Sequence, residues 1–365
     1  MTSEVNEIVE PEGDIEIIAE EFPKHIDIDL SNRCNLRCRF CFLVSHKPEK
    51  WQQLSYDQFL KVTPLLENAK DISLFSKYEP LTCRDFIPIF NKVCEYDIET
   101  YFSTNGILLN DDIIDALVGR LTYLTVSVTG FTRESYTKNM SQDKLETVCE
   151  NLVKLNAAKK VANTEYPKLR ITFVGMLDML DELCQSVDFA VKFEASEGVR
   201  MTYFKSYDEN MNQYLPLNEP ETVAAAVAEA SAYAQSLGTS FEPIGGSIDN
   251  IEARMDKATG HRWCDMPWKG LSLQSNGDVY PCPVAYKSVG NFFESTFEKI
   301  WNGEELAAFR DGVNDPDLLN EDCRKCLHCR YGSAVDPETN DYSKAGKFIA
   351  GMKRKQTKTN DSIRK

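Results

Sequence analysis

Short runs of alternating apolar and polar residues recur along the first two thirds of the chain, and longer segments with helical spacing separate them. The runs with strand character are residues 26–30, 72–75, 100–103, 121–128, 169–175 and 199–204. The segments with helical character are residues 56–67, 86–95, 111–118, 133–155 and 180–193. This alternation predicts an α/β fold, with a parallel sheet and crossover helices. Six such units are too few to close an eight-stranded barrel.

The rest of the chain has a different pattern. An Ala-rich helical segment covers residues 219–237, and the two glycines at 245–246 then interrupt the chain in a way typical of a loop. Further on, Asn276 and Gly277 separate two short apolar runs, which predicts a tight β-hairpin. A helical pattern over residues 296–310 follows the hairpin. We therefore expect a small second unit after the α/β part.

Composition narrows the class of protein. The chain has 365 residues, enough for one large domain and a smaller one. Its formal net charge of -16 argues against a nucleic-acid-binding surface, because phosphate binding needs a basic face. The acidic N-terminal segment lacks the pattern of a signal peptide, and no apolar run is long enough to span a bilayer. We expect a cytoplasmic protein with no nucleic-acid or membrane partner.

The chain contains twelve cysteines. The cytoplasm keeps thiols reduced, so groups of cysteines there indicate metal sites more often than disulfides. Cys34, Cys38 and Cys41 have the spacing C-x3-C-x2-C and follow a predicted strand directly. Three thiolates at this spacing suit an iron–sulfur cluster whose fourth iron stays open to a substrate or cofactor. A structural zinc site is the alternative, with His46 as the nearest fourth ligand.

This segment resembles the signature of the radical S-adenosylmethionine (SAM) superfamily, which has the same cysteine spacing and an aromatic residue, here Phe40, before the last cysteine. The resemblance implies a partial (β/α)6 TIM-like barrel with a [4Fe-4S] cluster at the carboxyl end of its first strand. It also implies that this cluster passes one electron to bound SAM. The resulting 5′-deoxyadenosyl radical would then abstract hydrogen from an unactivated carbon.

The segment after the second predicted strand resembles the family's Gly-Gly-Glu-Pro element, which receives the methionyl ammonium group of SAM. Glu79 and Pro80 match this element, whereas Lys77 and Tyr78 replace its two glycines. The two bulky side chains change the approach of the backbone to that amino group. The carboxylate of Glu79 is still able to neutralise an ammonium group.

Other strand ends resemble further SAM-contacting elements of the family. The implied contacts to the carboxylate, ribose and adenine of SAM are Ser103, Thr104, Asn105, Ser127 and Val174. Each segment also has an ordinary structural interpretation, since Asn105 and Gly106 form a common turn dipeptide and the apolar run around Val174 suits a buried strand. Thr129 stands where family members commonly carry an acid.

A second cysteine group lies toward the C-terminal end. Its members are Cys264, Cys282, Cys323, Cys326 and Cys329. The first two, with Gly277 between them and a helix centred on Trp301 after them, resemble the start of the SPASM auxiliary-cluster domain. The later cysteines of that domain are missing, so the group also resembles the shorter twitch form. The resemblance implies one auxiliary [4Fe-4S] cluster on Cys264, Cys282, Cys323 and Cys326, with a structural zinc as the alternative.

Cys329 remains outside that set of four. Its possible roles are a replacement ligand, a hydrogen-atom donor as in some radical epimerases, and a spectator thiol. The other cysteines have no metal-ligand spacing and are expected in the core of the barrel, where a thiol is a small apolar side chain. They are Cys83, Cys94, Cys149 and Cys184.

These observations divide the chain into four parts. They are an acidic extension over residues 1–23, the partial barrel over 24–240, the SPASM/twitch domain over 241–335 and a basic tail over 336–365. The tail is expected to be disordered, with docking to an acidic electron donor as the alternative. The family resemblance implies a donor of the flavodoxin or ferredoxin type.

Three functions fit the sequence. The first is a dehydrogenase or epimerase of a small sugar or aminocyclitol metabolite, favoured by the single-cluster pattern and the short segment before the first strand. The second is a maturase that crosslinks, epimerises or oxidises a peptide or protein. The third is an electron-transfer or scaffold protein, which would not need residues that resemble a SAM site. We predict the first, an oxidoreductase or isomerase, with a peptide substrate as the alternative.

Overall fold

The computed structural model describes residues 21–204, 206–244, 264–313, 318 and 320–323. The strands are β1 (His25–Ile28), β2 (Asp71–Ser73), β3 (Glu99–Thr104), β4 (Tyr123–Ser127), β5 (Lys168–Gly175), β6 (Val199–Tyr203), β7 (Phe241–Ile244), β8 (Gly270–Leu273), β9 (Asp278–Tyr280) and β10 (Gly290–Asn291). The α-helices are α1 (Tyr56–Leu60), α2 (Phe86–Val93), α3 (Asp111–Leu117), α4 (Arg133–Met140), α5 (Leu145–Val161), α6 (Leu183–Lys192), α7 (Pro220–Ser236), α9 (Met266–Lys269), α10 (Phe297–Trp301) and α11 (Glu304–Asp311). Short 3-10 helices are η1 (Phe42–Val44), η2 (Thr63–Glu67), η3 (Pro80–Thr82), η4 (Leu177–Glu182), η5 (Glu209–Tyr214) and η6 (Pro216–Asn218).

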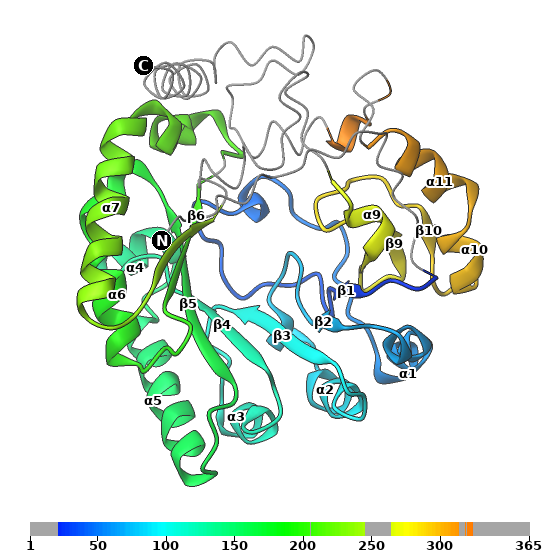
Figure 1. Ribbon diagram of the computed structural model, residues 1–365, viewed down its shortest axis with the longest axis horizontal. Helices are drawn as coiled ribbons and strands as arrows, with labels where there is room; N and C mark the ends of the chain where they lie inside the picture. Colours follow the sequence, from blue (N-terminus) through cyan, green and yellow to red (C-terminus); the bar gives the residue numbers. More distant parts are fainter. Residues whose placement is uncertain (1–20, 205, 245–263, 314–317, 319, 324–365) are drawn as a thin grey trace, which may run out of the picture.

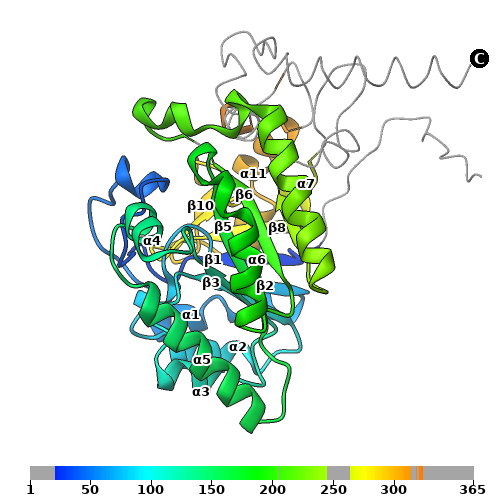
Figure 2. The same cartoon turned by 90° about the vertical axis from the view of Figure 1, so that its left-hand side faces the viewer.

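The described strands form a single sheet in the order β10-β9-β8-β1-β2-β3-β4-β5-β6-β7. Pairing is parallel from β8 through β1 to β7, and β9 pairs antiparallel with both β8 and β10. The sheet is curved, with α1, α2, α3, α5, α6 and α7 on its outer side (Figure 1). Figure 2 shows α6 and α7 along this outer side from another direction. Within the described part of the chain the edge strands β7 and β10 do not pair, so the barrel is open, as predicted.

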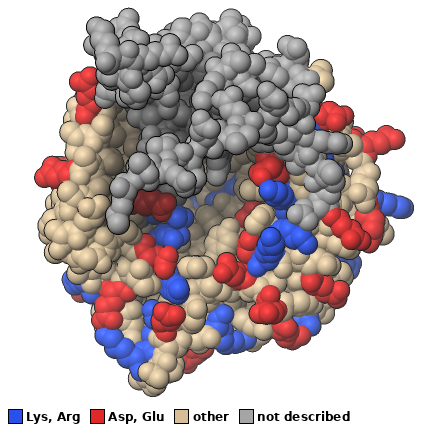
Figure 3. Space-filling model, in the orientation of Figure 1, with Lys and Arg blue, Asp and Glu red and all other residues tan. Residues whose placement is uncertain are grey.

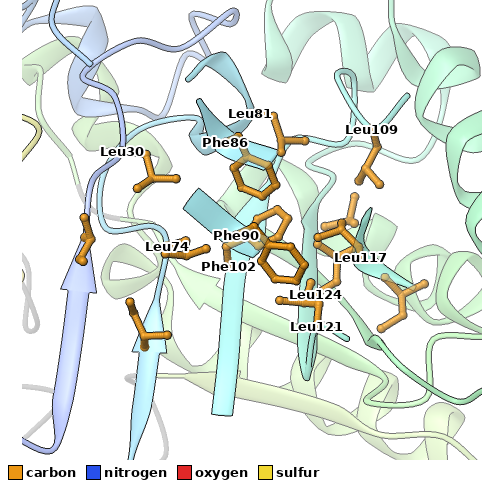
Figure 4. Close-up of a cluster of buried hydrophobic side chains, with 14 of the residues drawn as sticks. Leu30, Leu74, Leu81, Phe86, Phe90, Phe102, Leu109, Leu117, Leu121 and Leu124 are labelled. Carbon is orange, nitrogen blue, oxygen red and sulfur yellow. The ribbon is translucent and has the colours of Figure 1, made fainter. Parts of the chain in front are cut away.

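Side-chain alternation explains why these segments form a curved sheet with one apolar face. In β5 the buried residues Leu169, Ile171 and Phe173 alternate with half-buried residues, and β4 has the same pattern. The buried side chains face the helices. Figure 4 shows this core, in which the ring of Phe86 on α2 contacts Phe102 of β3 edge to face with the ring centroids 5.2 Å apart. The polar positions are therefore left for the inner side of the sheet.

The structure contains two strand pairings that the sequence pattern did not predict. β7 adds a seventh parallel strand beyond β6, and β8 pairs in parallel with β1 through the register His25 with Gly270. The predicted hairpin at Asn276 is confirmed, because β8 and β9 are antiparallel and Gly277 has a φ of 89°. The hairpin thus continues the main sheet. This pairing brings the segment after Cys264 next to the strand that leads into the first cysteine group.

Three predicted helical segments are each divided in the structure, so the single helices were wrong. The segment 56–67 contains α1 and the 3-10 helix η2. The segment 133–155 contains α4 and α5, because Ser141 adopts a left-handed conformation with a φ of 68° and ends α4. The segment 296–310 contains α10 and α11, and Gly303 lies between them. A Cβ atom at Gly303 would lie 2.3 Å from the carbonyl oxygen of Lys299, so this close approach requires glycine.

A buried carboxyl on β1 gives the fold a pH-dependent stability. Burial, together with the charges of Asp29 and Asp71, raises the pKa of Asp27 from 3.8 to about 7. The folded protein holds this proton more tightly than the unfolded chain, so the stabilisation is complete below about pH 4 and is lost as the pH rises through about 7. Asp27→Asn removes this titration. We expect it to raise the free energy of unfolding by on the order of 2 kcal/mol at pH 8, and by less at pH 5.

Urea unfolding at the two pH values measures this difference. Asp97→Asn is the matched control, because Asp97 is exposed and its replacement should act equally at both pH values. Equal effects of Asp27→Asn at pH 5 and pH 8 would contradict the prediction.

Candidate active site at the carboxyl ends of the strands

The first cysteine group lies in the loop that follows β1, at the carboxyl end of the parallel strands. Cys34, Cys38 and Cys41 are half-buried and none of them forms a disulfide. The three thiols are close enough for the charge of each thiolate to affect the others. Burial raises the pKa of Cys34 to about 11, with smaller contributions from Glu79 and Cys41. Burial also raises the pKa values of Cys38 and Cys41.

The donor set fits an iron–sulfur cluster. Three buried thiols that repel one another as thiolates need a cation to hold them deprotonated, and iron supplies that charge. The backbone N–H of Leu36 donates a hydrogen bond to Sγ of Cys34 at 3.4 Å, which stabilises a thiolate. Within the described ranges no three His, Cys, Asp or Glu side chains converge so as to hold one metal ion. In a cubane cluster each cysteine binds a different iron, so its thiols surround the cluster instead of meeting at one point.

Arg39 fixes the cysteine loop to the helices on the other side of the barrel. Its Nε donates to Oδ1 of Asn139 at 2.6 Å, and its Nη2 lies 2.8 and 2.9 Å from the two carboxylate oxygens of Asp178. Its guanidinium also stacks over the ring of Tyr214 with 4.8 Å to the ring centroid. Burial favours the neutral form of Asp178, but hydrogen bonds from Arg39 and Lys138 hold the pKa of that carboxyl below its ordinary value. The loop is therefore anchored by a charged network between its second and third cysteines.

Arg39→Lys should weaken this anchor, because lysine keeps the charge but loses the planar fork that contacts two partners. We expect the reconstituted protein to release iron to a chelator roughly tenfold faster than the wild type, since each lost charged hydrogen bond costs about 1.5–3 kcal/mol. Absorbance decay of the cluster in excess EDTA measures the rate.

Arg133→Lys is the control for this measurement. Arg133 also pairs with an aspartate, Asp143, but both side chains are exposed. Its variant should release iron at the wild-type rate, because exposed pairs contribute little. Equal release rates in the two variants would rule out an anchoring role for Arg39.

Glu79 is the centre of a buried hydrogen-bond network. Its Oε1 accepts from the hydroxyl of Thr104 at 2.8 Å and from the backbone N–H of Leu81 at 3.2 Å. Its Oε2 accepts from the backbone N–H of Asn105 at 2.8 Å. Burial raises the pKa of Glu79 to about 7, and these hydrogen bonds oppose the shift. The network joins the ends of β2 and β3.

The same network reaches the cysteine loop. The side-chain amide of Asn105 donates to Oδ1 of Asn35 at 2.7 Å, and the backbone N–H of Glu79 donates to the carbonyl of Arg33 at 3.0 Å. Asn35 was not singled out from the sequence, because its position within the cysteine motif has no fixed residue type. The structure thus connects Glu79, Thr104 and Asn105 to the residue that follows Cys34.

The remaining predicted SAM contacts lie along the same edge of the sheet. Ser103, Ser127 and Val174 are half-buried at the ends of β3, β4 and β5. Thr129 is fully buried, and its hydroxyl accepts the backbone N–H of Val174 at 3.2 Å. Thr129 therefore fixes the end of β5 at the position where an acid was expected. The contacts of these residues to SAM stay a prediction.

A pocket of about 550 Å³ lies beside the cysteine loop, between that loop, the end of β2 and the β8–β9 hairpin. The residues that line it are Phe40, Cys41, Phe42, His46, Ser76, Lys77, Tyr78, Tyr207, Gln274, Tyr280, Pro283, Val284, Ala285 and Tyr286. Most of these side chains are aromatic or apolar, which is typical of ligand pockets. Figure 3 shows a hollow at the centre of the face seen in Figure 1, bordered by charged side chains of both signs.

The second cysteine group is only partly described. Cys264 precedes α9, Cys282 follows β9, and Cys323 lies at the end of the described residues. Cys326 and Cys329 lie outside the described residues, as does the basic tail, so the ligand set of an auxiliary cluster stays a prediction. Cys282 lies near enough to Lys77 for their charges to interact, so this cysteine is close to the part of the pocket that Lys77 lines.

The cysteines predicted in the core are buried or half-buried. Cys83 is 4% exposed, and Cys94, Cys149 and Cys184 are half-buried and pack against the core. Burial raises the pKa of Cys83 to about 11, so this thiol stays protonated at neutral pH. None of the helices in the described residues has the length and apolar character of a membrane span.

Two family models match the chain. The model of the radical SAM superfamily matches residues 28–183, and the model of an iron-sulfur cluster-binding domain, SPASM, matches residues 264–327. The first range begins at the last residue of β1 and contains the cysteine loop and β2 to β5, and the second contains the hairpin and four of the five late cysteines. Together they imply a SAM-binding [4Fe-4S] cluster and auxiliary iron–sulfur chemistry.

Similar proteins are distant in sequence. The chain is 21% identical to the tungsten-containing aldehyde ferredoxin oxidoreductase cofactor-modifying protein of Pyrococcus furiosus, over 79% of this chain and 83% of that protein. It is 22% identical to the PqqA peptide cyclase of Granulibacter bethesdensis, over 84% of this chain and 80% of that protein. The fold is similar to that of Streptococcus suis SuiB bound to precursor peptide SuiA, with a TM-score of 0.59, 16% identity and coverage of 79% of this chain and 66% of that one. The chain therefore contains a radical SAM domain over residues 28–183 and an iron–sulfur cluster-binding domain of the SPASM family over residues 264–327.

Proposed function

We propose that this radical SAM enzyme modifies a peptide or protein, by crosslinking, epimerising or oxidising a residue at an unactivated carbon. The observation that carries the proposal is the pocket between Cys41 and the hairpin, which is bounded by residues of both cysteine-bearing segments. Two of the similar proteins named above have peptides in their names or titles, PqqA and SuiA. These relatives support a peptide substrate better than the small sugar or aminocyclitol that we predicted from the sequence.

The size and lining of the pocket support this substrate. Its volume of about 550 Å³ lies within the range of sites that hold drug-sized groups, which is the size of one or two amino-acid residues. Phe42 and Tyr78 contact each other with ring centroids 5.7 Å apart, and Tyr207 contacts Phe42 from another side. Aromatic walls of this kind hold an apolar side chain in place without specifying its sequence neighbours.

The chemistry follows from the cofactor and from the residues that would hold it. When bound, the cluster supplies the electron that cleaves SAM to a 5′-deoxyadenosyl radical. Cys34, Cys38 and Cys41 would hold that cluster, and Glu79 with Asn105 would orient SAM beside it. Phe40 and Cys41 line the pocket, so a residue held there would lie next to the cluster loop and be shielded from water by the aromatic side chains.

The auxiliary cluster is the second part of the proposal. Four cysteines, Cys264, Cys282, Cys323 and Cys326, are enough for one [4Fe-4S] cluster of the twitch type. Such a cluster would accept the second electron of an oxidation. For Cys329 the three alternative roles given from the sequence still apply: a replacement ligand, a hydrogen-atom donor or a spectator thiol. An electron donor of the flavodoxin or ferredoxin type would supply the first electron.

The test uses the hydrogen that moves from substrate to 5′-deoxyadenosine. Cells that make this protein are grown in deuterated medium, and their extract is separated into a metabolite fraction and a peptide and protein fraction. Each fraction is incubated anaerobically with reconstituted enzyme, SAM and dithionite. We expect 5′-deoxyadenosine one mass unit heavier only with the peptide and protein fraction, as measured by mass spectrometry.

Protease treatment and an inactive variant complete the experiment. Digestion of the peptide fraction before the assay should abolish deuterium transfer, and the variant without Cys34, Cys38 and Cys41 should show none with either fraction. Deuterium transfer from the metabolite fraction, resistant to protease, would overturn the peptide proposal and favour the small-molecule enzyme.

A further inference from the structure

Lys77 and Tyr78 replace the two glycines of the family's SAM-contacting element, and both line the pocket beside the cysteine loop. They extend from the end of β2 into the pocket described above, next to Tyr280 of the hairpin. Two side chains that narrow this space would be a disadvantage if they had no function. Their position indicates a role toward the molecule that occupies the pocket.

Lys77 is a half-buried cation close enough to the carboxylate of Asp29 for their charges to interact. Its ammonium lies 5.3 Å from the centroid of the Tyr280 ring, and it makes no ion pair or hydrogen bond with any residue that the structure describes. The nearby carboxylate of Asp29 accepts hydrogen bonds from the backbone N–H groups of Ser76 and Lys77, at 3.0 and 2.9 Å. Asp29 therefore holds the backbone of this loop and leaves the ammonium available.

Two opposing effects act on the pKa of Lys77. Burial lowers the pKa of Lys77, while the charges of Asp29, Cys282 and Asp322 act in the opposite direction. Among the lining residues of the pocket Lys77 is the one lysine or arginine, within the described part of the chain. An unpaired cation in a pocket of aromatic side chains is a strong attractor for one anionic group.

Two phenols add hydrogen-bond donors at the same place. The hydroxyls of Tyr78 and Tyr280 have no hydrogen-bond partner among the described residues. A phenol has an ordinary pKa of about 10, so both hydroxyls can donate a hydrogen bond at neutral pH. A carboxylate has two oxygens that accept such hydrogen bonds, and a charged hydrogen bond is about twice as strong as a neutral one.

We propose that Lys77, assisted by Tyr78 and Tyr280, binds a carboxylate of the molecule in this pocket. For a peptide substrate this carboxylate is an Asp or Glu side chain or the C-terminal carboxylate, next to an apolar or aromatic group that fills the rest of the pocket. The identification of the molecule that bears this carboxylate as a peptide rests on the proposed function. The other source of the same chemistry is the carboxylate of SAM itself, and the experiment separates the two.

The experiment compares two small probes that differ in one group, a carboxylate in the first and an uncharged amide in the second. N-acetyl-L-phenylalanine and N-acetyl-L-phenylalaninamide are dialysed to equilibrium against the full-length protein, reconstituted with its clusters under anaerobic conditions. We expect the acid to bind about tenfold more tightly than the amide, and Lys77→Met to reduce that ratio to about one. Lys77→Arg should keep a preference for the acid. Iron content checks that each variant is loaded.

Lys61→Met is the matched control. Lys61 also lies over an aromatic ring, with 5.8 Å to the centroid of Phe293, but it is exposed and outside the pocket. This variant should keep the wild-type ratio of acid to amide. A wild-type protein that binds both probes equally, or neither at millimolar concentration, would overturn the proposal, as would an unchanged ratio in an iron-loaded Lys77→Met protein.

Dialysis of S-adenosylhomocysteine against the same variants identifies the source of the carboxylate. If Lys77 serves the substrate, Lys77→Met leaves the affinity for S-adenosylhomocysteine unchanged. A tenfold loss of that affinity, with no change in the ratio of acid to amide, would assign Lys77 to SAM and overturn its role in substrate binding. Neither result depends on deuterium transfer from the peptide fraction, so failure of the proposed function is a separate outcome.

Discussion

Replacement of Cys34, Cys38 and Cys41 together by alanine is expected to lower the iron content from about eight to about four irons per chain, because one of two [4Fe-4S] clusters loses its ligands. The same variant should release no 5′-deoxyadenosine from SAM in the presence of dithionite, whereas the wild type should. The reason is that the three thiols share one loop after β1 and act on one another through their charges. Iron and sulfide analysis with electron paramagnetic resonance measures both clusters on anaerobically reconstituted protein.

A second triple variant controls for the loss of cysteine as such. Cys94, Cys149 and Cys184 are half-buried in the barrel and have no metal-ligand spacing. Their replacement by alanine should leave about eight irons and full SAM cleavage, because the thiols serve as small apolar side chains. Zinc in place of iron, or wild-type protein that does not cleave SAM, would refute the assignment of the first cysteine group. A content of about four irons in the wild type would contradict the auxiliary cluster and leave the assignment of the first cysteine group unchanged.

Glu79→Gln is expected to abolish productive SAM binding and to destabilise the fold. Both carboxylate oxygens of Glu79 accept hydrogen bonds, from Leu81, Thr104 and Asn105. A glutamine has one amide nitrogen in place of an oxygen, so a donor would face a donor in a fully buried position. We expect a cost of about 1–3 kcal/mol in the free energy of unfolding and at least a tenfold loss of SAM affinity.

Urea unfolding and equilibrium dialysis of SAM give the two quantities separately. Glu95→Gln is the matched control, because Glu95 is exposed and pairs only with Lys92 on the surface. Its replacement should change neither quantity beyond about 0.5 kcal/mol. If Glu79→Gln binds SAM as tightly as the wild type, the network around Glu79 is structural and the SAM contact predicted from the sequence is wrong.

Some residues of the candidate site were not predictable from the sequence, because their roles come from partners far away in the chain. Arg39 occupies a variable position of the cysteine motif, and only the folded chain brings Asn139 and Asp178 against it. The role of Asn35 also depends on a distant partner, because Asn105 lies 70 residues later in the chain. Motif spacing predicts which side chains can hold a cluster. It does not predict which neighbours hold the motif.

The substrate prediction was limited in a similar way, because it rested on features that do not describe the substrate site. The preference for a small metabolite came from the number of late cysteines and from the length of the segment before the first strand. Neither feature describes the space in which a substrate lies. The pocket combines residues of the cysteine loop, of the end of β2 and of the hairpin, and its aromatic walls became visible only when these three segments were folded together.

The sequence by itself determined the alternation of the first six strands with helices and the place of the cysteine loop, because these follow from local alternation and motif spacing. It also predicted the hairpin at Asn276. The open barrel was implied by the family resemblance. The tertiary structure alone decided that β8 pairs with β1 and that β7 extends the sheet, since register between distant segments depends on the packing of both faces. That pairing places Tyr280 beside Lys77 and creates the pocket in which we propose that the substrate binds.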